Sequence, residues 1–374
     1  MKEWEKHMFN KNLHIWIGGY IKQAFNPFTS PPSDGPIDIL FCVADHFEPM
    51  WRRPDYQTEC ARVQTWLSRY PLLAKHHRDA DGRPPQHTFF YPEEEYRPEH
   101  LDALAKLCQQ GYGEVDIHLH HDQDTPKGFV DKIEQFKKLL SEKHGLLCKD
   151  KKTGRVQYGF IHGNWALDNS RKDGRWCGVN NELILLKETG CYADFTLPSA
   201  PSDTQTPKIN SIYYATDNPV RPRSHDTGTD VGVGIPPTGD LLMIQGPLAL
   251  NFKNRKMGLF PKIENGEITG DNPATSIRAD LWINQHIHVK GRPEWVFVKV
   301  HTHGTQEESF EALLGKPMDD LLSYLETQYN DGVLYRLHYV TAREMYNIVK
   351  AAEAGKSGNP HPYRDYHLVP GGGL

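Results

Sequence analysis

The chain has 374 residues, 38% of them hydrophobic, so it can bury a core of domain size and does not have the composition of a disordered protein. Its formal net charge of −5, with both signs mixed along the chain, excludes the basic stripe typical of nucleic-acid-binding proteins. No apolar run is long enough for a transmembrane segment and no secretory leader is recognisable, so we expect a cytoplasmic protein. Six scattered cysteines without a CxxC pair predict free thiols.

Strand and helix patterns alternate along the chain, which is typical of a parallel α/β architecture. Apolar runs predict strands at 37–43, 87–91, 114–120, 156–161, 191–197, 241–245, 295–300 and 335–340. Helical periodicity, caps and breakers predict helices at 58–70, 98–110, 126–140, 180–190, 280–288, 317–325 and 341–349. The last of these begins with a capping box, Thr341 with Glu344 three residues later.

This order predicts a (β/α) barrel, either distorted or seven-stranded, in residues 37–350. Residues 1–36 form an N-terminal extension, whose apolar residues, among them Trp4 and Trp16, favour packing on the domain over docking on a membrane surface. A long insertion at about 198–290 is rich in proline and glycine at its start and is expected to shape a substrate groove. Residues 351–374 form a tail that is expected to fray.

The strand at 114–120 carries an unusual group of polar side chains. Read with a period of two, one side is apolar and the other side bears Asp116, His118 and His120, followed directly by His121 and Asp122. Imidazole and carboxylate groups are common ligands of zinc-like metals. A single histidine is usually a satisfied core residue, but three histidines beside two aspartates favour a metal or catalytic site.

Polar residues also follow three other predicted strands: Asp45 and His46, then His162, Asn164 and Trp165, then His301 and His303. The carboxyl ends of barrel strands meet at one face, so these side chains are expected to converge there with the histidine-rich strand. His118 and Asp122, with Asp45 or His46, would give three metal ligands and leave positions open for water and substrate. The competing interpretations are a turn cap for Asp45, a structural histidine at His301 and core packing of Trp165.

In these motifs the chain resembles the polysaccharide deacetylase family, carbohydrate esterase family 4, within the glycoside hydrolase/deacetylase barrels. The residues that carry the resemblance are Val43-Ala-Asp45-His46 against the family's TFDD motif, 113–122 against its histidine-rich metal motif, 297–301 against its late strand with a catalytic histidine, and 339–344 against its closing strand and helix. The chain departs from the pattern with His46 in place of a second aspartate, with Asp122 in place of a histidine, and with 160–165 in place of the groove motif.

The resemblance implies a metal-dependent hydrolase that removes an acetyl group, as amide or ester, from a sugar or polysaccharide precursor. The implied cofactor is a divalent metal ion, zinc first, with cobalt, nickel, manganese or iron as alternatives. Two alignments stay open: either Asp45 is the base and His46 the ligand, or Asp45 is the ligand and Ala44 replaces the base. The roles implied for other residues are metal binding by His118 and Asp122, acid catalysis by His301, and substrate contact by His120, His162, Asn164, Trp165 and His303.

Two other classes of function compete with the deacetylase. One is another metal-barrel hydrolase, or a glycosidase that uses Asp45, Glu48 and Asp116. The other is a non-catalytic glycan-binding protein on the same fold. Metal dependence distinguishes a metal-dependent hydrolase from a glycosidase, because a glycosidase needs two carboxyl groups around the scissile bond and no metal.

Overall fold

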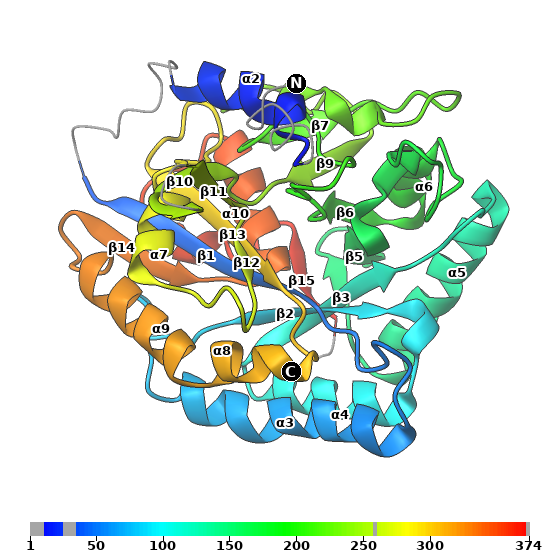
Figure 1. Cartoon of the computed structure of the whole chain (residues 1–374), viewed down its shortest axis with the longest axis horizontal. Coiled ribbons are helices and arrows are strands. Elements are labelled where there is room, and N and C mark those ends of the chain that lie inside the picture. The colour runs from blue at the N-terminus through cyan, green and yellow to red at the C-terminus, as the bar shows by residue number, and fades with distance from the viewer. Residues whose placement is uncertain (1–10, 25–34, 257–259, 372–374) are drawn as a thin grey trace.

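The computed structural model describes residues 11–24, 35–256 and 260–371. It shows a mixed α/β protein with a large, mostly parallel central sheet and helices around it (Figure 1). The helices are α2 (Leu13–Ala24), α3 (Tyr56–Ala74), α4 (Pro98–Gln109), α5 (Pro126–Lys138), α6 (Glu182–Thr189), α7 (Ser276–Ile283), α8 (Phe310–Leu314), α9 (Lys316–Gln328) and α10 (Ala342–Glu353).

The strands of this sheet run in the order β12-β13-β1-β2-β3-β5-β6-β9-β7-β8, and β14 also pairs with β1. Their bounds are β1 (Ile37–His46), β2 (His87–Pro92), β3 (Gly113–Leu119), β5 (Val156–His162), β6 (Cys191–Asp194), β7 (Ile212–Ala215), β8 (Thr229–Asp230), β9 (Leu241–Ile244), β12 (Glu267–Ile268), β13 (Trp295–Thr302) and β14 (Tyr335–Tyr339). The predicted parallel α/β sheet is therefore confirmed.

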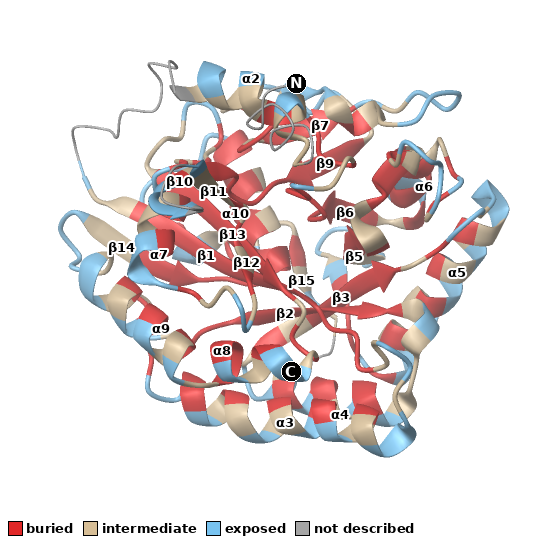
Figure 2. Cartoon of the chain, viewed as in Figure 1, coloured by how far each residue is buried: buried red, intermediate tan, exposed pale blue. Residues whose placement is uncertain are grey.

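Strand β1 lies at the centre of the sheet and is covered on both faces, which explains its nearly continuous apolar sequence. One edge pairs in parallel with β13 from Asp38 to Asp45. The other edge is shared, because β14 pairs with 37–41 and β2 pairs with 43–46. Figure 2 shows the buried strands in the middle of the molecule and exposed residues on the outer faces of α3, α4 and α9.

Local signals fix where the helices begin. The Asp55 side chain accepts a hydrogen bond from the Thr58 N–H at the start of α3, and Thr125 does the same for Gly128 at the start of α5. The predicted capping box of Thr341 and Glu344 is present at the start of α10. The helix predicted at 280–288 exists as α7, which begins earlier because Thr275 is its cap.

The proline- and glycine-rich insertion contributes strands to the sheet. Strand β9, predicted at 241–245, pairs in parallel with β6 through Met243 and Asp194, and β7 then pairs antiparallel with β9. A separate hairpin consists of β10 (Ala249–Lys256) and β11 (Phe260–Glu264). The first half of the insertion is thus an extension of the sheet, where the sequence indicated a long loop.

The segments that flank the predicted barrel domain both pack against it. Trp16 of α2 is fully buried and belongs to a small apolar cluster with Ala200, Ile209 and Leu248, as the packing interpretation expected. Trp4 lies outside the described residues. The expectation of a fraying tail is wrong as far as residue 371, because β15 (Leu368–Pro370) pairs antiparallel with β4 (Cys148–Asp150).

All six cysteines are free, as predicted. No helix within residues 11–24, 35–256 and 260–371 combines the length and apolar character that crossing a lipid bilayer requires.

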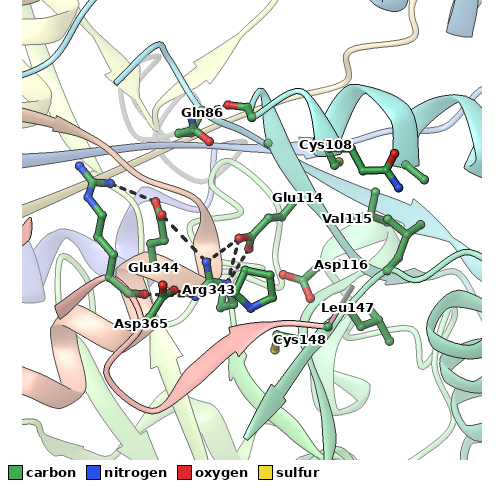
Figure 3. Close-up of a pocket in the computed structure, with 18 of the residues that line it drawn as sticks. Gln86, Cys108, Glu114, Val115, Asp116, Leu147, Cys148, Arg343, Glu344 and Asp365 are labelled. Carbon is green, nitrogen blue, oxygen red and sulfur yellow. Dashed lines mark hydrogen bonds and ion pairs between the residues drawn. The ribbon is translucent and has the colours of Figure 1, made fainter. Parts of the chain in front are cut away.

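A cavity of about 690 Å³ opens near the amino-terminal end of β3, with Cys108, Val115 and Leu147 in its wall (Figure 3). Its charged side chains pair with one another. Arg343 contacts Glu114 at 2.7 Å and Asp365 at 2.5 Å. In the same wall Glu344 contacts Arg83 at 2.5 Å and Arg364 at 3.0 Å. These ion pairs connect α10 to β3, to the loop before β2 and to the C-terminal segment.

Asp116 lies in the wall of this cavity and gives a first prediction. Burial raises its pKa from 3.8 to about 7, although the Tyr192 hydroxyl and the Gly159 N–H donate to it. The folded protein therefore keeps this proton after the unfolded chain has lost it, and Asp116 costs stability as the pH rises from about 4 to about 7. Asp116→Asn should therefore increase stability more at about pH 8 than at about pH 5, by on the order of 1–4 kcal/mol.

Urea unfolding of both proteins at the two pH values checks this prediction. An equal effect of the substitution at both pH values would contradict it.

Candidate metal centre

From the end of β1 onward, successive side chains point to opposite sides of the chain. Asp45 and Phe47 point toward α3, where the Phe47 ring lies 5.8 Å from that of Trp66. His46 and Glu48 point the other way, toward the carboxyl end of β3. The period of two thus continues past the strand and brings an imidazole and a carboxylate to the same place.

His118 comes to this place from the carboxyl end of β3. Its Nδ1–H donates to the carbonyl oxygen of Ile161 in β5 at 2.8 Å. This bond leaves a lone pair on Nε2, which lies 3.1 Å from Oε1 of Glu48. His46, Glu48 and His118 are buried, and one ligand atom from each lies within 4.8 Å of the others.

The surroundings keep this group in the protonation state that binds metals. Burial alone would raise the pKa of Glu48, but the hydrogen bond with His118 and the nearby imidazoles lower it to about 2. Burial and the neighbouring imidazoles lower the pKa values of His46 and His118. A carboxylate and two neutral imidazoles are the form in which these residues coordinate a metal.

The contact between His118 and Glu48 also fits a bound cation. Unless a second proton occupies Nε2 of His118 and donates to Glu48, Nε2 and the Glu48 oxygen are both acceptors, and buried acceptors that face each other are unfavourable. A metal ion between them removes this conflict. Two imidazoles and one carboxylate form a ligand set used by catalytic zinc sites and by non-haem iron sites, so His46, Glu48 and His118 fit a divalent metal.

A histidine–glutamate pair borders the metal group. Nδ1 of His120 hydrogen-bonds to Oε1 of Glu94, and its Nε2 lies 3.4 Å from Oε1 of Glu48. Burial would lower the pKa of His120, but the bond with Glu94 and the charge of Glu48 raise it to about 9. His120 therefore places a positive charge next to the group.

Two aromatic side chains form the less buried side of the centre. The His303 ring lies 4.6 Å from that of His46, and the Trp165 ring lies 6.1 Å from His46 and 5.9 Å from His303. Both are only partly buried, whereas His46 and His118 are almost inaccessible. Asn164 precedes Trp165 in a turn with left-handed backbone, φ 53°.

His301 lies beneath this rim with its ring 6.3 Å from that of His46. The side chain is buried, and neither ring nitrogen has a hydrogen-bond partner among the described residues. Burial and the charge of Lys299 hold the pKa of His301 well below its usual range, so the ring is neutral.

Three residues predicted for the site lie elsewhere, the first of them Asp45. Its Oδ1 accepts from the Gly304 N–H at 2.6 Å and its Oδ2 lies 2.9 Å from Nε2 of His87. Asp45 thus positions the segment after β13 and does not belong to the group of His46 and His118.

The expectation that Asp122 joins His118 is corrected by the path of the chain. No helical turn follows β3; the backbone turns at Gln123, where φ is 48°. Asp122 is exposed and accepts from the Trp176 N–H at 2.6 Å. His162, expected at the sugar site, faces His121 in a separate buried cluster, with the two Nε2 atoms 2.8 Å apart.

The sequence analysis missed two residues of the centre. Glu48 was considered only for a glycosidase, although continuing the alternation from His46 by two residues points to it. Glu94 lies in a short 3-10 helix after β2 and carries no periodic signal. A third group of potential ligands, Asp79, Asp81 and His338, is already paired within the protein, because both nitrogens of His338 bind aspartates at 2.8 Å.

Comparison of the sequence with protein-family models and with curated proteins finds no match.

The metal group predicts which substitutions remove a metal. Purified His118→Ala and Glu48→Ala should each contain one metal equivalent fewer than the wild type, because each loses one of three ligands. Asp122→Ala is the matched control and should keep the wild-type content, since Asp122 contacts only the loop at Trp176. Inductively coupled plasma mass spectrometry measures the content. Equal losses in all three variants would contradict this ligand set.

The close approach of Gly304 to Asp45 gives another prediction. A Cβ at residue 304 would lie 2.0 Å from Oδ2 of Asp45, so Gly304→Ala has to displace a buried carboxylate. We expect a loss of about 1–3 kcal/mol of unfolding free energy. In the control Gly18→Ala the new methyl meets nothing within 4 Å, and the variant should be as stable as the wild type or more so. Urea unfolding compares them, and equal stability of the two variants would refute the argument.

Proposed function

We propose that the protein is a metal-dependent hydrolase that removes an acetyl group, as amide or ester, from an acetylated carbohydrate. The observation that carries the proposal is the convergence of His46, Glu48 and His118 at the carboxyl ends of parallel strands, beneath a partly accessible rim. The motifs that resemble those of polysaccharide deacetylases favour this chemistry, and a distorted (β/α) barrel, as the resemblance implies, is the closed form we propose for the sheet.

His46, Glu48 and His118 would hold the metal, zinc before cobalt, nickel, manganese or iron. A divalent ion bound there supplies Lewis-acid polarisation of the acetyl carbonyl and activation of water. The Ile161 carbonyl orients His118 through the Nδ1–H bond, a contact that keeps Nε2 available as the ligand atom.

Proton transfer is best supported for the pair of His120 and Glu94. Their hydrogen bond places an imidazole between a carboxylate and the metal group, with Nε2 directed at Glu48. This arrangement suits a residue that exchanges a proton with water and with the departing amine or alcohol. Asp45 is less suited to act as the base, because both its oxygens are engaged, one with Gly304 and one with His87. His301 has free ring nitrogens and would bind the substrate or the leaving group.

The rim favours a sugar as the substrate. Trp165 and His303 offer ring faces beside His46, and an indole provides a large contact area for the apolar face of a pyranose. A glycosidase is less well supported, because Asp116 is buried against Tyr192 and Gly159 and Asp45 is engaged by Gly304. Two accessible carboxyl groups around one bond are therefore not presented by these residues.

Acetate release tests the proposal. The metal-loaded protein should release acetate from N-acetylglucosamine oligomers or from acetylated xylan, and a chelator should abolish the release until metal is restored. Glu48→Gln and His46→Ala should lower the rate about 100-fold or more, because even groups behind the ligands contribute 10- to 100-fold in metal sites. Asp122→Ala serves as the folded control with wild-type rate.

No acetate from either class of substrate by the metal-loaded protein would refute the deacetylase. New reducing ends without acetate would identify a glycosidase instead.

A further inference from the structure

A second group of potential metal ligands lies apart from the centre described above. It comprises His121 after β3, His162 at the end of β5, Cys177 in the following loop and Glu182 at the start of α6. All four residues are buried, and one ligand atom from each lies within 4.8 Å of the others. None of them has a role in the proposed hydrolysis.

The distances show that these side chains point at one another. The Nε2 atoms of His121 and His162 are 2.8 Å apart. Oε1 of Glu182 lies 3.2 Å from the first and 3.4 Å from the second of these nitrogens. Its Oε2 lies 3.5 Å from Sγ of Cys177. Four chemically different donors from three separate stretches of chain therefore share one small volume.

The hydrogen bonds of the two imidazoles leave lone pairs facing each other. Nδ1–H of His162 donates to the Gly163 carbonyl at 2.5 Å, so Nε2 of a neutral His162 is an acceptor. Nδ1 of His121 lies 3.2 Å from Oδ2 of Asp124. A proton on Nδ1 of His121 leaves two Nε2 lone pairs opposed beside a carboxylate. A proton on Nε2 instead leaves Nδ1 as an acceptor against Asp124. The first form opposes two lone pairs, and the second makes the Nε2–H bond to His162 but leaves Nδ1 of His121 without a hydrogen-bond partner among the described residues.

Cys177 would supply the sulfur ligand, and because burial and the Glu182 carboxylate raise the pKa of its thiol, a bound metal has to displace the thiol proton. Its Sγ accepts from the Asn169 N–H at 3.3 Å and from the Val179 N–H at 3.5 Å. Backbone donors directed at sulfur stabilise its charged form and are the usual second layer of a metal site. The second oxygen of Glu182 accepts from the Asp168 N–H at 2.5 Å, which fixes the carboxylate in place.

We propose that His121, His162, Cys177 and Glu182 bind a second metal ion, a structural Zn²⁺ with four protein ligands. A thiolate, two imidazoles and a carboxylate satisfy a tetrahedral zinc ion and leave no position for substrate, in contrast to the three-ligand centre at His46. The thiolate selects zinc over magnesium and calcium.

The position of this zinc gives it a mechanical role. The ion would join the ends of β3 and β5 to the loop at 163–181 and to the first turn of α6. Trp165 lies in that loop, so the structural zinc would hold part of the rim of the first centre in place. The proposal stands independently of the hydrolase function.

Cobalt substitution of the whole protein provides the decisive test. Loaded with Co²⁺, the wild type should bind two equivalents and show a near-ultraviolet thiolate-to-cobalt charge-transfer band. Cys177→Ser should lose that band and one equivalent. His118→Ala should lose the other equivalent and keep the band. Cys191→Ser is the matched control, because Cys191 is also a buried thiol that donates to a backbone carbonyl, and it should keep both metals and the band.

Absence of the band in folded, cobalt-loaded wild type would overturn the proposal without relying on any variant. Survival of the band in Cys177→Ser would overturn it as well. The hydrolase proposal fails separately, through absence of acetate release from protein that shows the band.

Discussion

The two clusters of potential metal ligands depend on one constraint: hydrogen-bond acceptors that are buried and face other acceptors need a cation between them. At His118 the Nδ1–H donates to a backbone carbonyl, so in the neutral imidazole the Nε2 lone pair faces the buried Glu48 carboxylate. At His121 and His162 two imidazole nitrogens meet beside Glu182. Without a cation such contacts would oppose folding, because each polar atom would lose its hydration and gain no donor in return.

The pairing of β3 with β5 connects these two places. His118 lies opposite Ile161 and Leu119 lies opposite His162, so one parallel ladder sets the height of side chains in both clusters. Adjacent residues of a strand point to opposite faces of the sheet. His118 therefore lies on the face of its partner Ile161, and His162 points to the opposite face. The two clusters thus come from the same strand ends but differ in character: one has a rim with partial access to solvent, and the other is closed by four protein side chains.

The features that could be predicted from the sequence are the strands, which have a periodic pattern, and the residues at strand ends. Strands β1 and β13 were found because strands buried on both faces are apolar throughout; His46 was found because it ends such a strand, and His118 because apolar and polar residues alternate along β3. Asp122 was misplaced because a single left-handed residue, Gln123, directs the chain away from a helical turn. Cys177 had no signal at all, since it lies in an irregular loop whose path no pattern sets. The ordered tail was missed because its anchor, buried Arg364, binds Asp79 and Asp81 from a distant turn.

The partners on the two edges of β1 also affect the order in which the protein folds during synthesis. On one edge, 43–46 pair with β2, which is close in sequence, but 37–41 of that edge require β14 and the whole other edge requires β13. A strand whose partners are separated by most of a chain has high contact order, which slows folding because a long loop has to close first. During synthesis, His46 would therefore wait in an incompletely paired strand until β13 has left the ribosome. The residues proposed to hold the metal, His46, Glu48 and His118, are thus all synthesised before β13, the strand that completes the pairing of β1.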